Sequence, residues 1–164
     1  MNKPKDIKIN IREMTLNDIN VIKKIEYETY KKKDEPIDFY NEIKNHFSQY
    51  VIAEIIDIKK EITNIIGFAG IWIFQGETHI AQIAVAKKWQ RKNIGNQLLK
   101  HCTALAKEYG AQHIVLEVHE KNITSNKFFS ANNFIEIKKK KNYYKNKDGT
   151  CSDAIIMKKI LFKR

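Results

Sequence analysis

The sequence contains 164 residues, of which 43% are hydrophobic and 30% charged, a balance typical of a folded globular protein, and we expect residues 1–164 to form a single domain. No apolar run reaches the ~18 residues of a membrane helix, and the charged first residues lack a signal-peptide core, which favours a cytoplasmic protein without a membrane partner. The net charge is +11, but only three of the 30 basic residues are arginine, the residue best suited to reading bases and clamping phosphates. We therefore expect solvated lysine faces rather than a specific nucleic-acid site.

The first part of the chain predicts a strand followed by two helices. Isoleucine alternates with polar residues over 7–14, which indicates a strand with one buried face. Thr15 and Asp18 have the spacing of a weak capping box, so we expect a helix to begin at residue 15. The charged, proline-containing segment 31–36 ends that helix, and a short second helix is expected over 38–47.

The rest of the chain alternates strands with helices. The pattern predicts, in order, strands over 50–57, 65–75 and 79–86, a helix over 94–110, a strand over 114–118, a helix over 122–131, and a final hairpin of strands over 134–144 and 154–162. Gly76 marks the turn between two of these strands, and Gly110 is a suitable C-terminal stop for a helix. This order predicts an α/β protein with a mixed sheet.

The segment that follows the strand over 79–86 carries a possible anion site. Its basic loop, residues 90–96, leads directly into a helix, so that several main-chain N–H groups lie at the positive end of a helix dipole. A Cβ at Gly95 would keep an anion away, while Lys88, Arg91 and Lys92 add positive charge. The loop matches neither the P-loop pattern nor the Rossmann fingerprint, and a simple tight turn remains an equally good interpretation.

Five segments together resemble a known family. The run Gln90-Arg91-Lys92-Asn93-Ile94-Gly95 is similar to the Q/R-x-x-G-x-G/A motif of the GNAT acetyltransferase superfamily, with Asn93 in place of the first glycine. Asn tolerates a positive φ better than other side chains, so we expect the loop to keep its shape. The other similar segments are, in family order, 11–19, 67–72 with 80–85, 116–122, and 142–157. The last of these is most similar to the ribosomal-protein-alanine N-acetyltransferase (RimI) type.

The resemblance implies a single-domain GNAT (acyl-CoA N-acyltransferase) fold, a mixed and mostly antiparallel sheet of about seven strands flanked by about four helices. It also implies acetyl-CoA as the cofactor. Main-chain groups of Ile83, Ala84 and Val85 would line the acetyl and pantetheine arm, and the Val85 N–H would polarise the thioester carbonyl and stabilise the oxyanion by ~3–4 kcal/mol. The pyrophosphate would be held by Gln90, Arg91, Lys92, Asn93, Ile94, Gly95 and Asn96.

On the acceptor side, the resemblance assigns Glu117 as the general base, acting directly or through a water. Read alone, Glu117 is an ordinary polar strand residue. An amine attacks only when neutral, and a chain N-terminus has a pKa of about 7.7–8.0 against about 10.4 for lysine, so a modest base is enough for an α-amine. Tyr143 and Tyr144 match the substrate-binding hairpin of the family, although aromatic packing on the sheet would explain them equally well.

Asn122 and Phe129 complete the implied site. Asn122 matches a residue that contacts the cofactor arm, and it would also cap a helix. The family's general acid is a tyrosine near the sulfur of CoA, but the matching residue here is Phe129, which has no proton to donate. Phe129 would still contact the cofactor, and Tyr143 is the candidate catalytic hydroxyl. Loss of a general acid slows a reaction by about 10²–10⁴-fold, and a thiolate is a tolerable leaving group without one.

We expect no metal site, because His79, His113 and His119 have no ligand spacing to one another or to Cys102 and Cys151. His119, close to Glu117 in sequence, could aid proton transfer, but an exposed strand histidine is the simpler interpretation.

The acceptor stays open at this point. The first hypothesis is a protein N-terminus, with a ribosomal protein as the partner. The second is a polyamine, another small amine or a lysine side chain, favoured only if Glu26, Glu28, Asp34 and Glu35 make the acceptor cleft acidic. A third, non-enzymatic hypothesis is a CoA-binding sensor, consistent with Phe129. A fourth hypothesis, a nucleic-acid binder, is disfavoured by the scarcity of arginine, and the sequence does not decide between a monomer and a homodimer.

Overall fold

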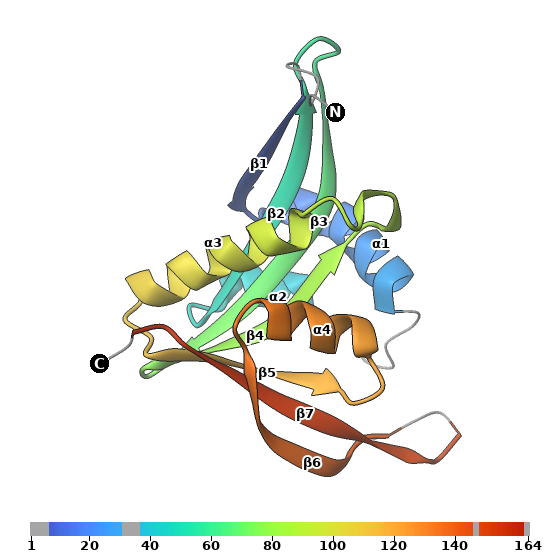
Figure 1. The fold of residues 1–164 in the computed structure, drawn as a ribbon. Coiled ribbons are helices and arrows are strands. Elements are labelled where there is room, and N and C mark those ends of the chain that lie inside the picture. Colours follow the sequence, from blue (N-terminus) through green and yellow to red (C-terminus); the bar gives the residue numbers. More distant parts are fainter. Residues whose placement is uncertain (1–6, 31–36, 146–147, 163–164) are drawn as a thin grey trace. The chain divides into compact units, whose positions relative to one another are not determined.

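In a computed structural model, the described residues are 7–30, 37–145 and 148–162, and they form seven strands and four α-helices (Figure 1). The hydrogen-bonded order of the strands is β1-β2-β3-β4-β5-β7-β6. The pairings of β1 with β2, β2 with β3, β5 with β7 and β6 with β7 are antiparallel, and that of β4 with β5 is parallel, so the predicted α/β class with a mixed, mostly antiparallel sheet is confirmed. The chain forms two compact units, Met1–Trp72 with Ala81–Leu105, and Ile73–Ile80 with Ala106–Arg164, and the expectation of a single domain stays a prediction.

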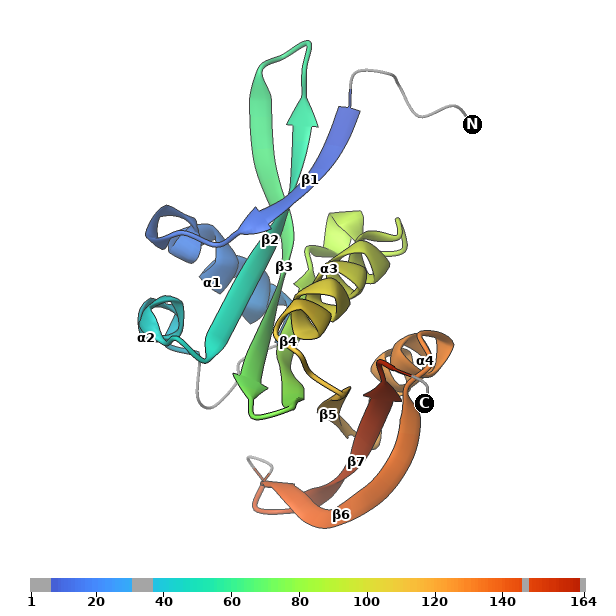
Figure 2. The same cartoon turned by 90° about the vertical axis from the view of Figure 1, so that its left-hand side faces the viewer.

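The N-terminal unit is built on three antiparallel strands, β1 (Ile7–Glu13), β2 (Ser48–Asp57) and β3 (Ile62–Phe74), together with the end of β4 (Glu77–Val85). Helices α1 (Ile19–Tyr30) and α2 (Phe39–Lys44) cover one face of these strands, and α3 (Ile94–Glu108) covers the other (Figure 2). The core beneath α1 and α2 is apolar and fully buried; its members include Ile22, Ile25, Phe39, Tyr50, Ile52 and Phe68. Burial of these side chains is the main force that holds the helices to the strands.

The start of the first helix is fixed by a charged network. Asp18 accepts hydrogen bonds from the Thr15 N–H at 2.8 Å and from the Arg12 guanidinium at 2.8 and 2.9 Å. The predicted capping pair is therefore confirmed, although the helix begins with a 3₁₀ turn, Leu16–Asp18, before α1. The Arg12 hydrogen bond and the Thr15 contacts hold the pKa of Asp18 down at about 2.

Gly67 allows β3 to lie close to the end of β4. A Cβ on Gly67 would lie 2.8 Å from the Ala84 carbonyl oxygen and 3.4 Å from the Val85 Cα. Both are backbone atoms that cannot move aside, so a side chain here would displace the end of β4. Ala86, just beyond β4, donates its N–H to the Ile66 carbonyl at 2.9 Å.

The C-terminal unit contains the β3–β4 turn and strands β5 (His113–His119), β7 (Cys151–Ile160) and β6 (Ile135–Lys145), with α4 (Ile123–Ala131) between β5 and β6 in the chain. The parallel pairing of β4 with β5 runs from Glu77↔His113 to His79↔Val115. On β5 the side chains of Ile114, Leu116 and Val118 are buried and those between them are half-buried. The alternation therefore places His113, Glu117 and His119 on one face of β5.

Several predicted boundaries move. The second helix ends at Lys44 rather than residue 47, because Asn45 already has an extended backbone. The last strand begins at Cys151 rather than residue 154, because Ser152 and Cys151 pair with Tyr144 and Lys145 on β6. The predicted helix end over 31–36 lies outside the described residues, as do residues 146–147 of the last turn. None of the described helices is long and apolar enough to cross a membrane.

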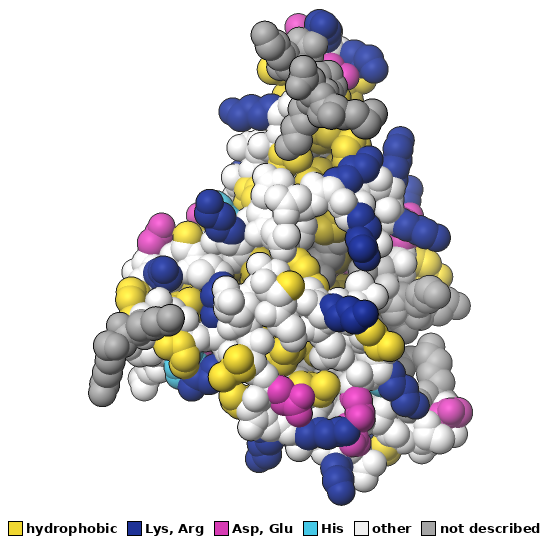
Figure 3. All heavy atoms as spheres, viewed as in Figure 1, with side chains coloured by type: hydrophobic (Ala, Val, Ile, Leu, Met, Phe, Trp, Pro, Cys, Tyr) yellow, Lys and Arg dark blue, Asp and Glu magenta, His cyan; other side chains and the backbone are white. Residues whose placement is uncertain are grey.

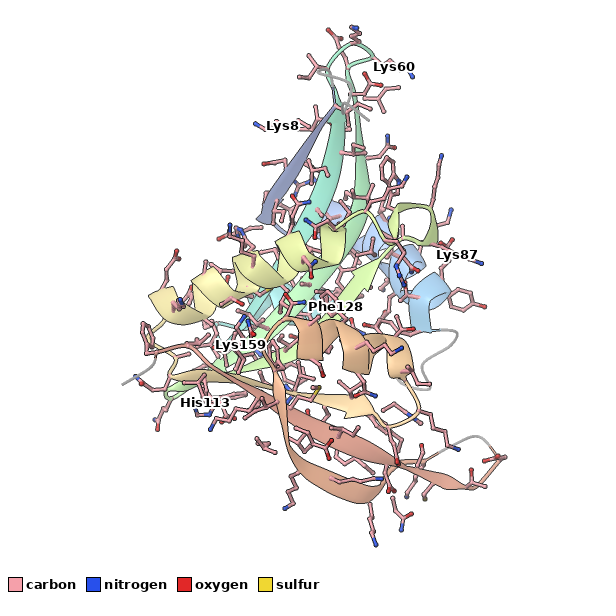
Figure 4. The ribbon with its side chains drawn as sticks, viewed as in Figure 1. Lys8, Lys60, Lys87, His113, Phe128 and Lys159 are labelled. Carbon is pink, nitrogen blue, oxygen red and sulfur yellow. The ribbon has the colours of Figure 1, made fainter. Side chains whose placement is uncertain are left out.

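Lysine and arginine side chains are spread over the face shown in Figure 3, among uncharged and hydrophobic ones. The labelled Lys8, Lys60 and Lys87 extend away from the segments that carry them (Figure 4). This distribution is the one expected of solvated lysine side chains.

Candidate functional site

The loop between β4 and α3 has an unusual backbone conformation. After a 3₁₀ turn, Lys87–Trp89, the loop places Arg91 at φ 60° and Asn93 at φ 65°, both in the left-handed region. The expectation that Asn93 replaces a glycine by accepting a positive φ is confirmed. Arg91 shares this conformation, which the sequence did not indicate, because arginine has no special preference for it.

Side-chain hydrogen bonds fix this loop. Gln90 Nε2 donates to the Val85 carbonyl at 2.9 Å, and Asn96 Nδ2 donates to Asn93 Oδ1 at 2.7 Å. Ile94 is buried, which anchors the first turn of α3, so only its main chain is available to a ligand. The Arg91, Lys92, Asn93 and Asn96 side chains are exposed around that turn. The loop and helix start therefore combine main-chain amides, positive charge and the positive end of a 15-residue helix, a combination suited to an anion.

The carbonyls at the end of β4 are held by side chains. The Tyr30 hydroxyl, from the last residue of α1, donates to the Ile83 carbonyl at 2.8 Å, while Gln90 holds the Val85 carbonyl. Burial raises the pKa of Tyr30 to about 12, so this hydroxyl stays protonated and remains a donor at neutral pH. The Ala84 side chain is buried. Both of these carbonyls therefore have a side-chain donor.

A cavity of about 580 Å³ opens on another side of the same loop. Its lining side chains come from β1, β2, the loop and the start of α3: Ile7, Lys8, Ile9, Ile55, Trp89, Lys92, Ile94 and Gln97. Lys92 places its ammonium 4.5 Å from the centre of the Trp89 ring. The cavity is lined mainly by apolar side chains, unlike the amide-rich helix start that an anion requires.

In the C-terminal unit, Glu117 is the centre of a charged cluster. Its Oε2 lies 2.5 Å from His79 Nε2, and its Oε1 lies 3.6 Å from the Lys140 ammonium. The parallel register explains the first contact, because His79 is paired with Val115 and Glu117 is the next residue on the same face of β5. The hydrogen bond from His79 lowers the pKa of Glu117, partial burial opposes this, and the charges of His79 and Lys140 lower it further. Glu117 is therefore ionised at neutral pH.

An aromatic group lies beside this cluster on β6. The Tyr144 ring stacks on His119 with centroids 5.1 Å apart and planes at 18°, and Tyr143 meets Tyr144 edge-on at 5.0 Å. His119 Nδ1 accepts the Lys121 N–H at 3.1 Å, so in the neutral ring Nε2 carries the proton and donates to Ser152 Oγ at 2.7 Å. His119 therefore has a structural role that sequence reasoning missed, since it holds the ring on which Tyr144 rests.

Tyr143 and Tyr144 differ in exposure. Tyr143 is 45% exposed. Tyr144 is half-buried, and burial, with smaller contributions from Tyr143 and Glu117, raises its pKa to about 12. Both tyrosines lie on β6, the strand that carries Lys140. The Tyr144 hydroxyl is protonated at neutral pH.

The structure confirms the capping role of Asn122 and places Phe129 in an aromatic cluster. Asn122 Oδ1 accepts the Ser125 N–H at 3.0 Å and so caps α4. Phe129 is buried and packs against Phe128, labelled on α4 in Figure 4, and against Phe134, at ring distances of 5.0 and 5.4 Å. Neither role tests a contact with a cofactor.

His79 and Lys140 are the residues that sequence reasoning missed. His79 was considered only as a metal ligand, and Lys140 only as part of a lysine run. The signal for His79 was its place on a strand that pairs with the strand of Glu117. Among the described residues, no cluster of three or more His, Cys, Asp or Glu side chains could hold a metal ion.

A family model described as the acetyltransferase (GNAT) family matches residues 16–134. A protein of Bacillus subtilis (strain 168), named as a provisional [ribosomal protein bS18]-alanine N-acetyltransferase, is 26% identical over 151 residues, which cover 92% of this chain and 94% of that protein. An N-alpha-acetyltransferase of Sulfolobus acidocaldarius is 27% identical over 161 residues and 92% of each chain. The crystal structure of the ribosomal-protein-S18-alanine N-acetyltransferase from Escherichia coli superposes with a TM-score of 0.78 at 22% identity, covering 96% of each chain, a likeness of fold.

Proposed function

The chain belongs to the GNAT family of acetyltransferases, and from this premise we propose that it transfers an acetyl group from acetyl-CoA to the α-amine of a protein N-terminus. The observation that carries the proposal is the left-handed Arg91–Asn93 loop at the start of α3, whose amides and charge suit a pyrophosphate. The names of the relatives from Bacillus subtilis and Sulfolobus acidocaldarius support an α-amine as the acceptor. A ribosomal protein is the first candidate among such acceptors.

The residues present fit this cofactor. The amides of Arg91, Asn93, Gly95 and Asn96 would hold the pyrophosphate, with Gln90 and Lys92 beside them. The amides of Ile83 and Val85 would contact the pantetheine arm, and the Val85 N–H would polarise the thioester carbonyl. Asn122 and Phe129 would contribute contacts from α4. When bound, acetyl-CoA supplies the activated acetyl group.

Glu117 is the base that we assign to the acceptor amine. It is ionised; its Oε2 is held by His79, and its Oε1 lies 3.6 Å from the Lys140 ammonium. Oε1 is therefore the oxygen that takes the amine proton, directly or through a water. Neutralising an α-amine at pH 7 costs about 1 kcal/mol, against nearly 5 kcal/mol for lysine, so a carboxylate of low pKa is sufficient for the former.

Because Phe129 cannot donate a proton, a tyrosine is the candidate for the general-acid role. Tyr143 is exposed on β6, and its ring lies 4.9 Å from the Lys140 ammonium. The hydroxyl pair of Tyr143 and Tyr144 would orient the acceptor, and Tyr143 is the candidate proton donor.

The test is a panel of acceptors assayed by release of the CoA thiol: peptides with a free N-terminal alanine, the same peptides blocked at the N-terminus but carrying lysine, and spermidine. We expect turnover with the free α-amine. Turnover only with lysine or spermidine would reassign the acceptor, and CoA binding without turnover on any amine would support a non-catalytic sensor.

A further inference from the structure

Lys140 is placed where an acceptor amine would have to approach Glu117. Its ammonium lies 3.6 Å from Glu117 Oε1 and 4.9 Å from the centre of the Tyr143 ring. The other carboxylate oxygen is held by His79. One cation of the protein therefore borders the carboxylate oxygen that His79 does not hold.

The strand register puts Lys140 there. Lys140 is paired with Ala154 on β7, and Ala154 is paired with His119 on β5, so Lys140, His119 and Glu117 share one face of the sheet. Its neighbour Lys139 projects from the opposite face and contacts Glu120 at 2.5 Å and Asp153 at 3.8 Å. The charge of Lys139 is thus matched by two carboxylates, whereas Lys140 shares Glu117 with His79 and with any incoming amine.

We propose that Lys140 excludes polyamines from Glu117 and reserves the site for an amine that brings no second positive charge within a few ångströms, such as a protein N-terminus. The inference rests on the proposed function. A monocationic acceptor brings one positive charge, which pairs with Glu117 in place of Lys140. The number of positive charges paired with Glu117 is therefore unchanged. Spermidine brings further ammonium groups within a few ångströms of Lys140, and each repels it without a second carboxylate to offset the repulsion.

The charged and titratable groups that face Glu117 are His79 from β4, Lys140 and the two tyrosines from β6, and His119 from β5. Loss of Lys140 alters the basicity of Glu117 for every acceptor alike. The ratio of two acceptors measured on one enzyme cancels that effect. The ratio therefore reports only the repulsion of additional charge.

The experiment compares kcat/KM for an uncharged-side-chain alanyl peptide with kcat/KM for spermidine, at low and high salt. The variants are Lys140→Met, Lys140→Arg, which keeps the charge, and Lys138→Met, which removes one charge from the same strand. We expect Lys140→Met to lower the peptide-to-spermidine ratio about tenfold at low salt, and less at high salt, where the charges are screened. Lys140→Arg and Lys138→Met keep the wild-type ratio.

A binding readout accompanies the rates. By calorimetry on the CoA-bound enzyme, spermidine should bind about tenfold more tightly to Lys140→Met than to the wild type. The inference would be overturned by an unchanged ratio and affinity in Lys140→Met, by an equal change in Lys138→Met, or by a wild type that prefers spermidine. The acetyltransferase assignment would still stand. A wild type that acetylates no amine at all would instead overturn the proposed function, and the inference with it.

Discussion

His79 Nε2 and Glu117 Oε2 are 2.5 Å apart, joined across the parallel pairing of β4 with β5. A second histidine–carboxylate pair, His113 and Glu77, lies at 2.6 Å on the same two strands. The two pairs have the same chemistry, but only the first includes the carboxylate that the proposed mechanism uses. The second pair is therefore a matched control for the first.

Glu117→Gln removes the proposed base while keeping the size of the side chain. We expect kcat to fall by about 10²–10⁴-fold, with part of the loss recovered at high pH, where more of the acceptor is already neutral. Glu77→Gln should leave kcat within a small factor of the wild type. Equal losses in both variants would show that the pairs act only on structure.

Asn93 tests whether the left-handed loop holds the cofactor. Asn93→Gly should preserve CoA affinity, since glycine accepts the φ of 65° without strain. Asn93→Val should weaken it about tenfold, because a β-branched residue is strained there by about 1–2 kcal/mol. Asn133→Val, which introduces the same residue at another asparagine of φ 65° outside this loop, is the comparison variant and should keep the wild-type affinity, measured by calorimetry. Similar affinities for all three would argue against a role for the loop conformation.

Tyr30→Phe leaves the Ile83 carbonyl without its side-chain donor at the end of β4. A buried acceptor that loses its partner costs about 1–3 kcal/mol, which urea unfolding would detect. Tyr27→Phe, on the same helix but 59% exposed, should change the free energy of unfolding by less than about 0.5 kcal/mol. If the two variants were equally stable, the Tyr30 hydrogen bond would contribute nothing.

Asp18 gives the N-terminal unit a dependence on acid. Its pKa is lowered to about 2 from an ordinary value near 3.8, so its stabilising contribution is present above about pH 4 and is lost as the pH falls toward 2. Allowing for solvent screening, we expect this contribution to be about 1–2 kcal/mol. Urea unfolding at pH 7 and pH 2.5 should show a smaller pH difference for Asp18→Asn than for the wild type. Asp57→Asn, which removes an exposed pair with Lys60, should retain the wild-type difference.

The sequence was sufficient for the periodic elements and for the motif loop. Alternating or helical spacing identifies an element from its own residues, and Asn93 could be read as a glycine substitute because asparagine tolerates a positive φ better than most side chains. The start of the last strand was misplaced because Cys151 and Ser152 are ordered by pairing with β6, a contact invisible to local spacing.

The cluster around Glu117 could be predicted only in part. The resemblance selected Glu117, but its partners come from two other strands, and their approach depends on the register of β4, β5, β7 and β6. The spacing of residues within one segment carries no information about that strand register. For the same reason His119 was read as an exposed strand residue, although Ser152 and Tyr144 enclose its ring.

The most direct measurement is isothermal calorimetry of the wild-type protein with CoA, and with pantetheine, which lacks the nucleotide diphosphate. Saturable heat with CoA and none with pantetheine is the result expected if the amides of residues 90–96 grip the pyrophosphate. No heat with CoA, or equal affinity for pantetheine, would contradict the proposal that this loop binds the pyrophosphate.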